Sequence, residues 1–108
     1  MAASSPETGL VIGRASDCGL VISHQSVSPH HAALHFDGEQ FGLQDLSSVN
    51  GTFVNGVRIV ATVLNEDQLL RTRGVVRQGR QALYGMDQLH TAHHLLVQGR
   101  VVRAGSHP

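Results

Sequence analysis

The stretch that decides the fold spans residues 31–56 and reads HAALHFDGEQFGLQDLSSVNGTFVNG. Within residues 31–36 every second side chain is apolar, which is typical of a strand that buries one face. Asp37-Gly38 then signals a tight turn, and two later Asn-Gly dipeptides enclose a short strand at 52–54. Strands this short, with turns this frequent, predict an antiparallel sandwich or barrel.

The same pattern continues on both sides of this stretch. The further strands that apolar runs predict are 10–12, 19–22, 57–64, 69–70 and 74–76. Residues 81–96 fit a short helix equally well, and residues 95–102 fit a hairpin. No helical period of useful length precedes residue 80, so the sequence predicts an all-β fold.

The composition allows one small domain and excludes several classes of protein. The chain has 108 residues, of which 41% are hydrophobic but only 4% aromatic, so its core must be mainly aliphatic. The single cysteine, Cys18, excludes a disulfide-stapled scaffold, and no apolar run approaches the roughly 20 residues of a membrane helix. Residues 1–9 lack the features of a signal peptide. We therefore expect an intracellular protein, nuclear or cytoplasmic, with no membrane partner.

Charge divides the chain into two unlike parts. Residues 1–70 hold two arginines against seven carboxylates, a net charge of −5, whereas residues 71–108 hold six arginines against one aspartate, a net charge of +5. This shift indicates a boundary near residue 70, although an arginine-rich face of one domain would give the same count. Clustered arginines also occur in nucleic-acid binders. Because aromatic side chains are not interleaved with them, a solvated segment is the better interpretation, and no nucleic-acid partner is expected.

Three loops carry hydrogen-bond donors in a pattern that suits an anion. They are Gly13-Arg14, residues 26–31 and residues 47–52, and they offer an arginine, serine hydroxyls, an asparagine amide and backbone N–H groups. Converging donors around one fixed positive charge are what a phosphate dianion requires, because a planar guanidinium pairs with two phosphate oxygens at a time. No nearby carboxylate is placed for acid–base chemistry, so catalysis is not expected.

The three loops, in this order, resemble the forkhead-associated (FHA) domain family, whose pattern is Gly-Arg, then Ser-x-x-His, then Asn-Gly with a second asparagine shortly after. The matching residues are Gly13-Arg14, Ser28 with His31, Asn50-Gly51 and Asn55-Gly56. The resemblance covers residues 10–70. Residues 71–108 match the family poorly and form an arginine-rich segment that we expect to be flexible or foreign to the original fold.

The resemblance implies a two-sheet antiparallel β-sandwich that binds a phosphothreonine-containing segment of a partner protein, without catalysis and without a cofactor. It implies that Arg14 holds the phosphate, that Ser28 donates its hydroxyl to the phosphate, and that Asn50 hydrogen-bonds the peptide main chain. The residues that it implies shape the loops are Gly13, His31, Gly51 and Asn55.

The chain departs from the family pattern around the expected phosphate site and at its ends. Pro29 stands where many relatives have arginine, lysine or asparagine, and Val49 where some have threonine, so two donors are missing. Few residues precede Gly13-Arg14 and the closing strands are hard to find, so we expect a sandwich incomplete at both ends. The alternative function is a β-sandwich of this type that has lost phosphate binding and serves as a structural contact module.

The histidines invite a metal site, because two groups of them are close in the sequence. These groups are His30, His31 and His35, and His90, His93 and His94. Common zinc sites add cysteine or carboxylate ligands at set spacings, whereas Cys18 is solitary and His31 belongs to the Ser-x-x-His pattern. We therefore predict no metal site, and the aspartate beside Cys18 argues against an activated thiolate.

Overall fold

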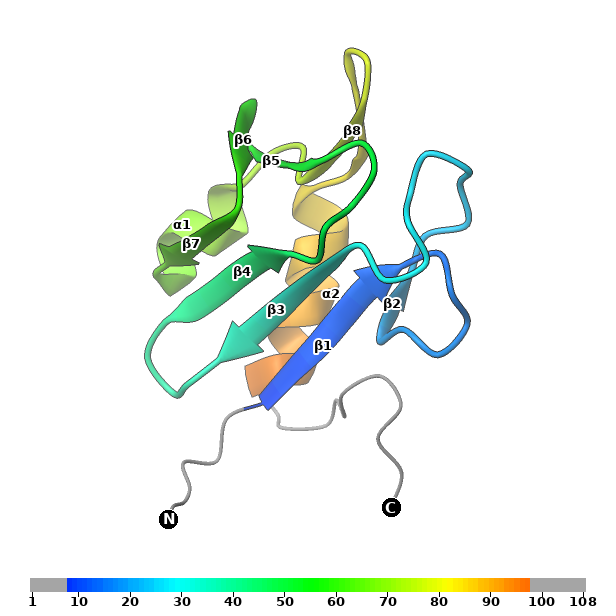
Figure 1. Cartoon of the computed structure of the whole chain (residues 1–108). Helices are drawn as coiled ribbons and strands as arrows, with labels where there is room; N and C mark the ends of the chain where they lie inside the picture. The colour runs from blue at the N-terminus through cyan, green and yellow to red at the C-terminus, as the bar shows by residue number, and fades with distance from the viewer. Residues whose placement is uncertain (1–7, 98–108) are drawn as a thin grey trace.

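The structure is a computed structural model that describes residues 8–97, and its main layer is a five-stranded sheet (Figure 1). The strands lie in the order β2-β1-β3-β4-β7, and each neighbouring pair is antiparallel except β1 and β2, which are parallel. The bounds are Thr8–Gly13 for β1, Leu20–Val21 for β2, Ala32–Phe36 for β3, Phe41–Asp45 for β4 and Ala61–Leu64 for β7.

The turn between β3 and β4 sets the register of the central strands. Asp37 accepts two hydrogen bonds of 2.9 Å from backbone N–H groups of the turn, and Gly38 adopts a φ of +102°, a conformation that favours glycine. The resulting register places Leu34 opposite Leu43, and both side chains are buried. A slip of one residue would turn these side chains to the other face of the sheet.

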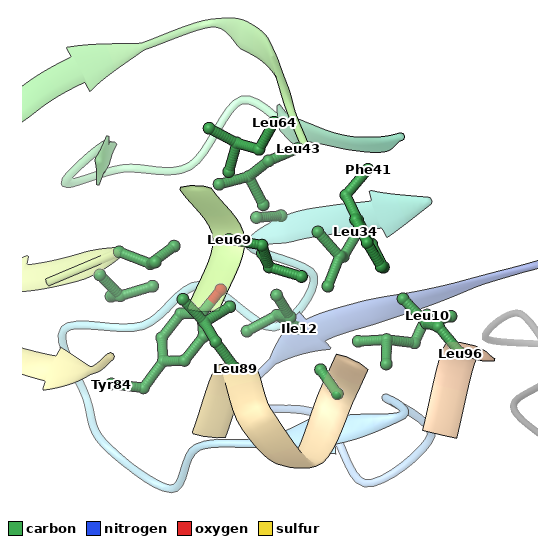
Figure 2. Packing of buried hydrophobic residues seen from close by; sticks show 14 of the residues in the cluster. Leu10, Ile12, Leu34, Phe41, Leu43, Leu64, Leu69, Tyr84, Leu89 and Leu96 are labelled. Atoms are coloured by element: carbon green, nitrogen blue, oxygen red, sulfur yellow. The ribbon is translucent and has the colours of Figure 1, made fainter. Parts of the chain in front are cut away.

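One face of the main sheet is buried and the other is open to solvent. Gln44 on β4 and Val63 on β7 are exposed on the open face. The buried side chains come from alternate positions of the strands, as the sequence predicts, and Figure 2 shows them packed together. Those contributed by the strands of the main sheet include Leu10, Ile12, Leu34, Phe41, Leu43 and Leu64.

Four further strands form two antiparallel hairpins beside the main sheet. Their bounds are Thr52–Val54 for β5, Val57–Ile59 for β6, Val76–Gln78 for β8 and Gln81–Tyr84 for β9. A hydrogen bond of 2.6 Å from Phe53 N to Val75 O joins the two hairpins. The mainly antiparallel β architecture predicted from the sequence is confirmed, and helices are few.

Residues 66–71 form a helix, α1 (Glu66–Arg71), where the sequence pattern predicts a strand at Leu69-Leu70. The strand prediction is wrong because a capping box begins a helix here. Asn65 Oδ1 accepts a hydrogen bond from Gln68 N at 2.7 Å, and Gln68 Oε1 accepts one from Asn65 N at 2.9 Å. Two acidic residues in the first turn also favour the helix through its dipole, and its buried leucine packs into the core.

The second helix, α2 (Met86–Val97), lies across the buried face of the main sheet (Figure 1). Its buried residues Leu89, Ala92 and Leu96 lie three and four residues apart, on the side that meets β1 and β3. The helical interpretation of residues 81–96 is correct from residue 86 onward. The hairpin predicted at 95–102 is wrong at residues 95–97, and its remainder lies outside the described residues. Neither helix in residues 8–97 is long and apolar enough to span a membrane.

The arginine-rich segment that begins at residue 71 supplies a large part of the core. Val75, Val76, Tyr84 and Leu89 belong to the same hydrophobic cluster as the side chains of the main sheet. The boundary predicted near residue 70 therefore runs through one shared core in the structure. Residues 98–108 of the segment lie outside the described residues.

Candidate functional site

Three loops meet at one end of the main sheet (Figure 1). Because β3 runs antiparallel to both of its neighbours, β1 and β4 finish at the same end of the sheet at which β3 begins. The loops that follow β1, precede β3 and follow β4 therefore leave the sheet together. They carry Arg14, Ser28 and Asn50 respectively, the three residues expected to bind a phosphopeptide.

Arg14 immediately follows β1 and is held by the loop that precedes β3. Its backbone N–H donates to Ser28 O at 3.1 Å, and its Nε donates to Val27 O at 3.0 Å. The exposed side chain lines a cavity of about 480 Å³. Within residues 8–97 the terminal nitrogens of the guanidinium have no hydrogen-bond partner, so they remain available to pair with an anion.

Gly13 allows the first two loops to approach each other. A Cβ atom at this position would lie 2.1 Å from Pro29 O and 2.8 Å from the carbonyl carbon of the same residue. Any side chain here would therefore push the two loops apart. The next link between them is a hydrogen bond of 3.1 Å from Ala15 N to Pro29 O.

Ser28 connects the second loop to the third. Its Oγ accepts a hydrogen bond of 3.1 Å from Val49 N, and its own backbone N–H donates to His31 Nδ1 at 3.0 Å. A serine hydroxyl has one hydrogen and two lone pairs. The hydroxyl can thus hold Val49 as an acceptor and still donate its hydrogen to a bound anion.

His31 is fully buried and links the second loop to the third through its imidazole ring. Since Nδ1 accepts from Ser28 N, the ring proton resides on Nε2, which donates to Gly51 O at 2.9 Å. The backbone of His31 adds a hydrogen bond to Ile12 O at 2.8 Å. Both ring nitrogens are therefore engaged inside the protein, and neither faces a ligand.

Asn50 extends from the third loop toward the second. Its Nδ2 donates to Ser26 O at 2.8 Å, while its Oδ1 has no partner among the described residues. The following Gly51 adopts a φ of +92°, and a Cβ on it would lie 2.8 Å from Arg58 Nε. Arg58 of β6 thus lies against this loop, although the sequence pattern does not single it out. In the β5–β6 hairpin Arg58 lies opposite Phe53, and this register is the signal that could have indicated a place for Arg58 beside the loop.

Asp45, the last residue of β4, holds the third loop in place. Its carboxylate accepts hydrogen bonds from both the backbone N–H and the hydroxyl of Ser48 and from Thr52 Oγ1, the last at 2.7 Å. Burial raises the pKa of Asp45, but the hydrogen bonds from Ser48 and Thr52 outweigh burial and leave the pKa below its ordinary value. The sequence pattern does not single out this role, although aspartate side chains commonly accept hydrogen bonds from the backbone of a following turn.

Asn55 lies apart from the other predicted residues. At a φ of +51°, it forms the turn between β5 and β6, and its Oδ1 accepts a hydrogen bond of 2.7 Å from Arg73 N. Its own N–H donates to Arg73 O at 3.1 Å. The structure therefore places Asn55 against the segment that precedes β8 and not among the three loops around Arg14.

A groove of about 630 Å³ opens beside Asn50. Its lining residues are Ser26, Asn50, Phe53, Gly56, Arg77, Gln78 and Gly79. Arg77 of β8 is a cation that the sequence places only in the arginine-rich segment. Its position across from Asn50 depends on the pairing of β5 with residue 75, a contact between distant parts of the chain that no local pattern reveals.

Asp17, Cys18 and His30 are the described residues that bring potential metal ligands together, with ligand atoms within 4.8 Å of one another. His30 Nε2 lies 3.0 Å from Asp17 Oδ1, and Cys18 Sγ donates to Pro29 O at 3.2 Å. Burial and the neighbouring aspartate raise the pKa of the Cys18 thiol. A protonated thiol that donates to a carbonyl holds the loop and is a poor metal ligand.

Comparison with known proteins places the three loops inside one recognised region. A family model described as FHA domain matches residues 10–73. The chain is 38% identical to the ABC transporter ATP-binding/permease protein Rv1747 of Mycobacterium tuberculosis over 65 residues. These residues make up 60% of this chain and 8% of that protein. The chain is 35% identical over 57 residues to the FHA domain-containing protein FhaB of the same species, with coverage of 53% and 37%. The chain thus spans less than two thirds of these relatives.

Solved structures with the same fold include domains in complex with partners. The FhaA FHA domain complexed with the intracellular domain of Rv3910 is 32% identical, with a TM-score of 0.52 over 55% of this chain and 65% of that one. Mycobacterium tuberculosis EmbR in complex with a low-affinity phosphopeptide is 37% identical, with a TM-score of 0.52 over 54% and 16%. The region that the family model matches, residues 10–73, holds Arg14, Ser28 and Asn50.

Proposed function

Because this chain belongs to the forkhead-associated domain family, we propose that it binds phosphothreonine-containing segments of partner proteins as a non-catalytic interaction module. The observation that carries the proposal is that the three loops with Arg14, Ser28 and Asn50 converge at one end of the main sheet and are joined by hydrogen bonds. Hydrogen bonds from Val49 N to Ser28 Oγ and from Asn50 Nδ2 to Ser26 O join the second and third loops. A hydrogen bond from Arg14 Nε to Val27 O joins Arg14 to the second loop.

The proposed roles follow from the hydrogen bonds that each side chain has left to make. The terminal nitrogens of Arg14 pair with the phosphate, and the Ser28 hydroxyl donates its free hydrogen to the same group. The Oδ1 of Asn50 accepts from a main-chain N–H of the peptide, beside the groove. The residues proposed to shape these loops without touching the ligand are Gly13, His31 and Gly51, whereas Asn55 shapes the turn between β5 and β6.

Two kinds of relative support the proposal. FhaA is described in complex with the intracellular domain of Rv3910, and EmbR in complex with a phosphopeptide. A further structure, 32% identical with a TM-score of 0.52, is described in terms of phosphothreonine-dependent FHA domain interactions.

An intracellular location, expected from the single cysteine, belongs to the same proposal, and fractionation of cells that express the chain would test it.

Calorimetric titration of the full chain with a phosphothreonine peptide library and its unphosphorylated twin tests the proposal. We expect binding to the phosphorylated library alone, and a loss of at least about tenfold for Arg14→Ala, because a bidentate charge-assisted pair is removed. Gln44→Ala, on the open face of the main sheet, is the control and should bind as the parent does. Equal binding of both libraries would favour the alternative, a contact module that has lost phosphate recognition.

A further inference from the structure

A second cationic site lies beside the β8–β9 hairpin, in a cavity of about 570 Å³ that we call the arginine pocket. Its lining residues are Asn55, Arg71, Arg73, Gly74, Arg77, Arg80 and Ala82. Residues 8–97 contain six arginines and seven carboxylates, so this part of the chain is nearly neutral. Four of those six arginines nevertheless line one pocket. The positive charge is therefore gathered and not spread over the surface.

These arginines have little compensation from within the protein. Arg71 pairs with the exposed Asp67 of its own helix at 3.3 Å. Among the described residues, Arg73, Arg77 and Arg80 have no carboxylate partner. Like charges held around one cavity repel each other, and an anion in the cavity would relieve that repulsion.

The walls of the pocket are held by hydrogen bonds and by a close contact. Asn55 fixes the backbone of Arg73 through two hydrogen bonds of 2.7 and 3.1 Å. Arg77 Nη2 donates to Arg80 O at 3.1 Å, which directs its guanidinium along the hairpin. Gly74 adopts a φ of +69°, a conformation that favours glycine, and a Cβ there would lie 3.3 Å from Ala82 Cβ and in ordinary contact with Arg77. The pocket is thus formed by ordered chain segments.

The pocket adjoins the groove beside Asn50, because Arg77 lines both. A peptide whose phosphate pairs with Arg14 and whose main chain meets Asn50 enters that groove. An extended chain that continues along the groove then reaches Arg77 and the arginines behind it. The lining of the pocket contains no aromatic side chain on which a nucleic-acid base could stack.

We propose that the arginine pocket binds a second anionic group on the same phosphothreonine-bearing segment, so that the domain selects partners with acidic or doubly phosphorylated flanks. This inference rests on the proposed function of the Arg14 site. Guanidinium groups suit both carboxylate and phosphate oxygens, since each presents a planar pair of N–H donors. The ligand chemistry is therefore an anionic group at a set distance from the phosphothreonine.

Titration of the full chain with a designed peptide series tests the inference. Each peptide keeps one phosphothreonine in an alanine-rich background, and a pair of aspartates moves stepwise outward on one side or the other. A second arm carries a phosphoserine at the best aspartate spacing and thereby distinguishes carboxylate from phosphate. We expect one side and a narrow range of spacings to bind about tenfold more tightly than the alanine parent at low salt.

Variants then assign the gain to the pocket. In Arg73→Gln and Arg80→Gln, the ratio of affinities for the acidic and the alanine peptides should fall toward one, while the thermal midpoint stays near that of the parent. Arg58→Gln removes the same charge outside the pocket, and its ratio should remain that of the parent, whatever its effect on either peptide alone. The ratio of the two affinities therefore reports the contact with the arginine pocket separately from the contact at Arg14.

The outcomes separate this inference from the proposed function. If the alanine-flanked phosphothreonine peptide does not bind at all, the proposed function fails. If that peptide binds but no aspartate or phosphoserine spacing improves the affinity, the arginine pocket has no such role. A gain that survives both Arg73→Gln and Arg80→Gln, or a random oligonucleotide that binds these arginines more tightly than the acidic peptide, would equally overturn the inference.

Discussion

His31 shows how one residue can look like a ligand in the sequence and be a structural bridge in the fold. Its two ring nitrogens join Ser28 N to Gly51 O, and no ring atom is left for a partner molecule. His31→Ala should leave both backbone groups unpaired, each at a cost of about 1–3 kcal/mol. We therefore expect thermal unfolding to show a loss of about 2–6 kcal/mol in stability.

His35→Ala is the matched control for this prediction, because His35 lies on β3 at a partly exposed position. Its midpoint of unfolding should stay close to that of the parent. An unchanged midpoint for His31→Ala together with lost phosphopeptide binding would assign His31 to the ligand site instead.

Pro29 and Val49 predict that phosphopeptide binding is weak in this chain. Val49 is 84% exposed beside Ser28, and Pro29 is exposed on the same loop, so the rim of the site holds apolar groups where donors would help. Pro29→Arg with Val49→Thr should tighten binding about ten- to a hundredfold, because each restored hydrogen bond contributes about 0.5–1.5 kcal/mol and arginine adds charge.

Both substitutions keep the backbone contacts that order the site. The carbonyl of residue 29 still accepts from Ala15 N, and the N–H of residue 49 still donates to Ser28 Oγ. Calorimetry on the single and double variants measures each contribution. If the double variant gains nothing and the parent already binds tightly, the phosphate is held by other groups.

At the scale of elements, the turn after β4 depends on a carboxylate. The pKa of Asp45 lies below its ordinary value of 3.8, since hydrogen bonds from Ser48 and Thr52 outweigh burial. A lowered pKa in the folded state stabilises the fold above the ordinary pKa, and this stabilisation is lost as the pH falls through the lowered value. Parent and Asp45→Asn should therefore differ most in stability at neutral pH.

Urea unfolding of both proteins between about pH 2 and pH 6 checks this prediction, with the gap closing toward the acid end. The comparison of variants is needed because the pKa of exposed Asp37 is also lowered, by backbone hydrogen bonds in its turn. Asp37 is unchanged in both proteins, so its effect cancels. A gap that stays constant or grows on acidification would contradict the assignment.

The elements that the sequence predicts correctly are those with a strong local signal. Alternation identifies β3 and β4, and the Asp-Gly and Asn-Gly turns mark where the chain reverses. Helix α1 is missed although Asn65 and Gln68 form a capping box, because the adjacent Leu69-Leu70 pair also fits a strand. A short apolar run does not by itself distinguish a buried strand from one turn of a buried helix.

At the scale of the whole molecule, the boundary near residue 70 is tested by truncation. A chain that ends at Gly74 loses Ala92 and five larger core side chains, which are Val75, Val76, Tyr84, Leu89 and Leu96. Burial of each contributes roughly 1.5–3 kcal/mol, whereas a whole domain is stable by about 5–15 kcal/mol. We expect this chain to be unfolded by circular dichroism and by the dispersion of its amide resonances.

A folded, dispersed spectrum for the truncated chain would establish residues 10–70 as an independent unit, as the charge shift alone indicates.

The same charge shift also corresponds to a feature of the folded structure. The arginines that follow residue 70 gather at the pocket beside the β8–β9 hairpin, next to the groove at Asn50. The segment that matches the family least thus supplies both core and charge.

Local sequence alone was sufficient to identify the family and the main strands and to single out Arg14, Ser28 and Asn50 as candidate donors, because turns, alternation and short motifs are properties of neighbouring residues. The arrangement of those donors required the tertiary structure. Ser28 meets Val49 across 21 residues, and Arg77 reaches the groove at Asn50 only because β5 pairs with residue 75. Such contacts depend on how distant segments bury a common core, and that burial is a property of the whole chain.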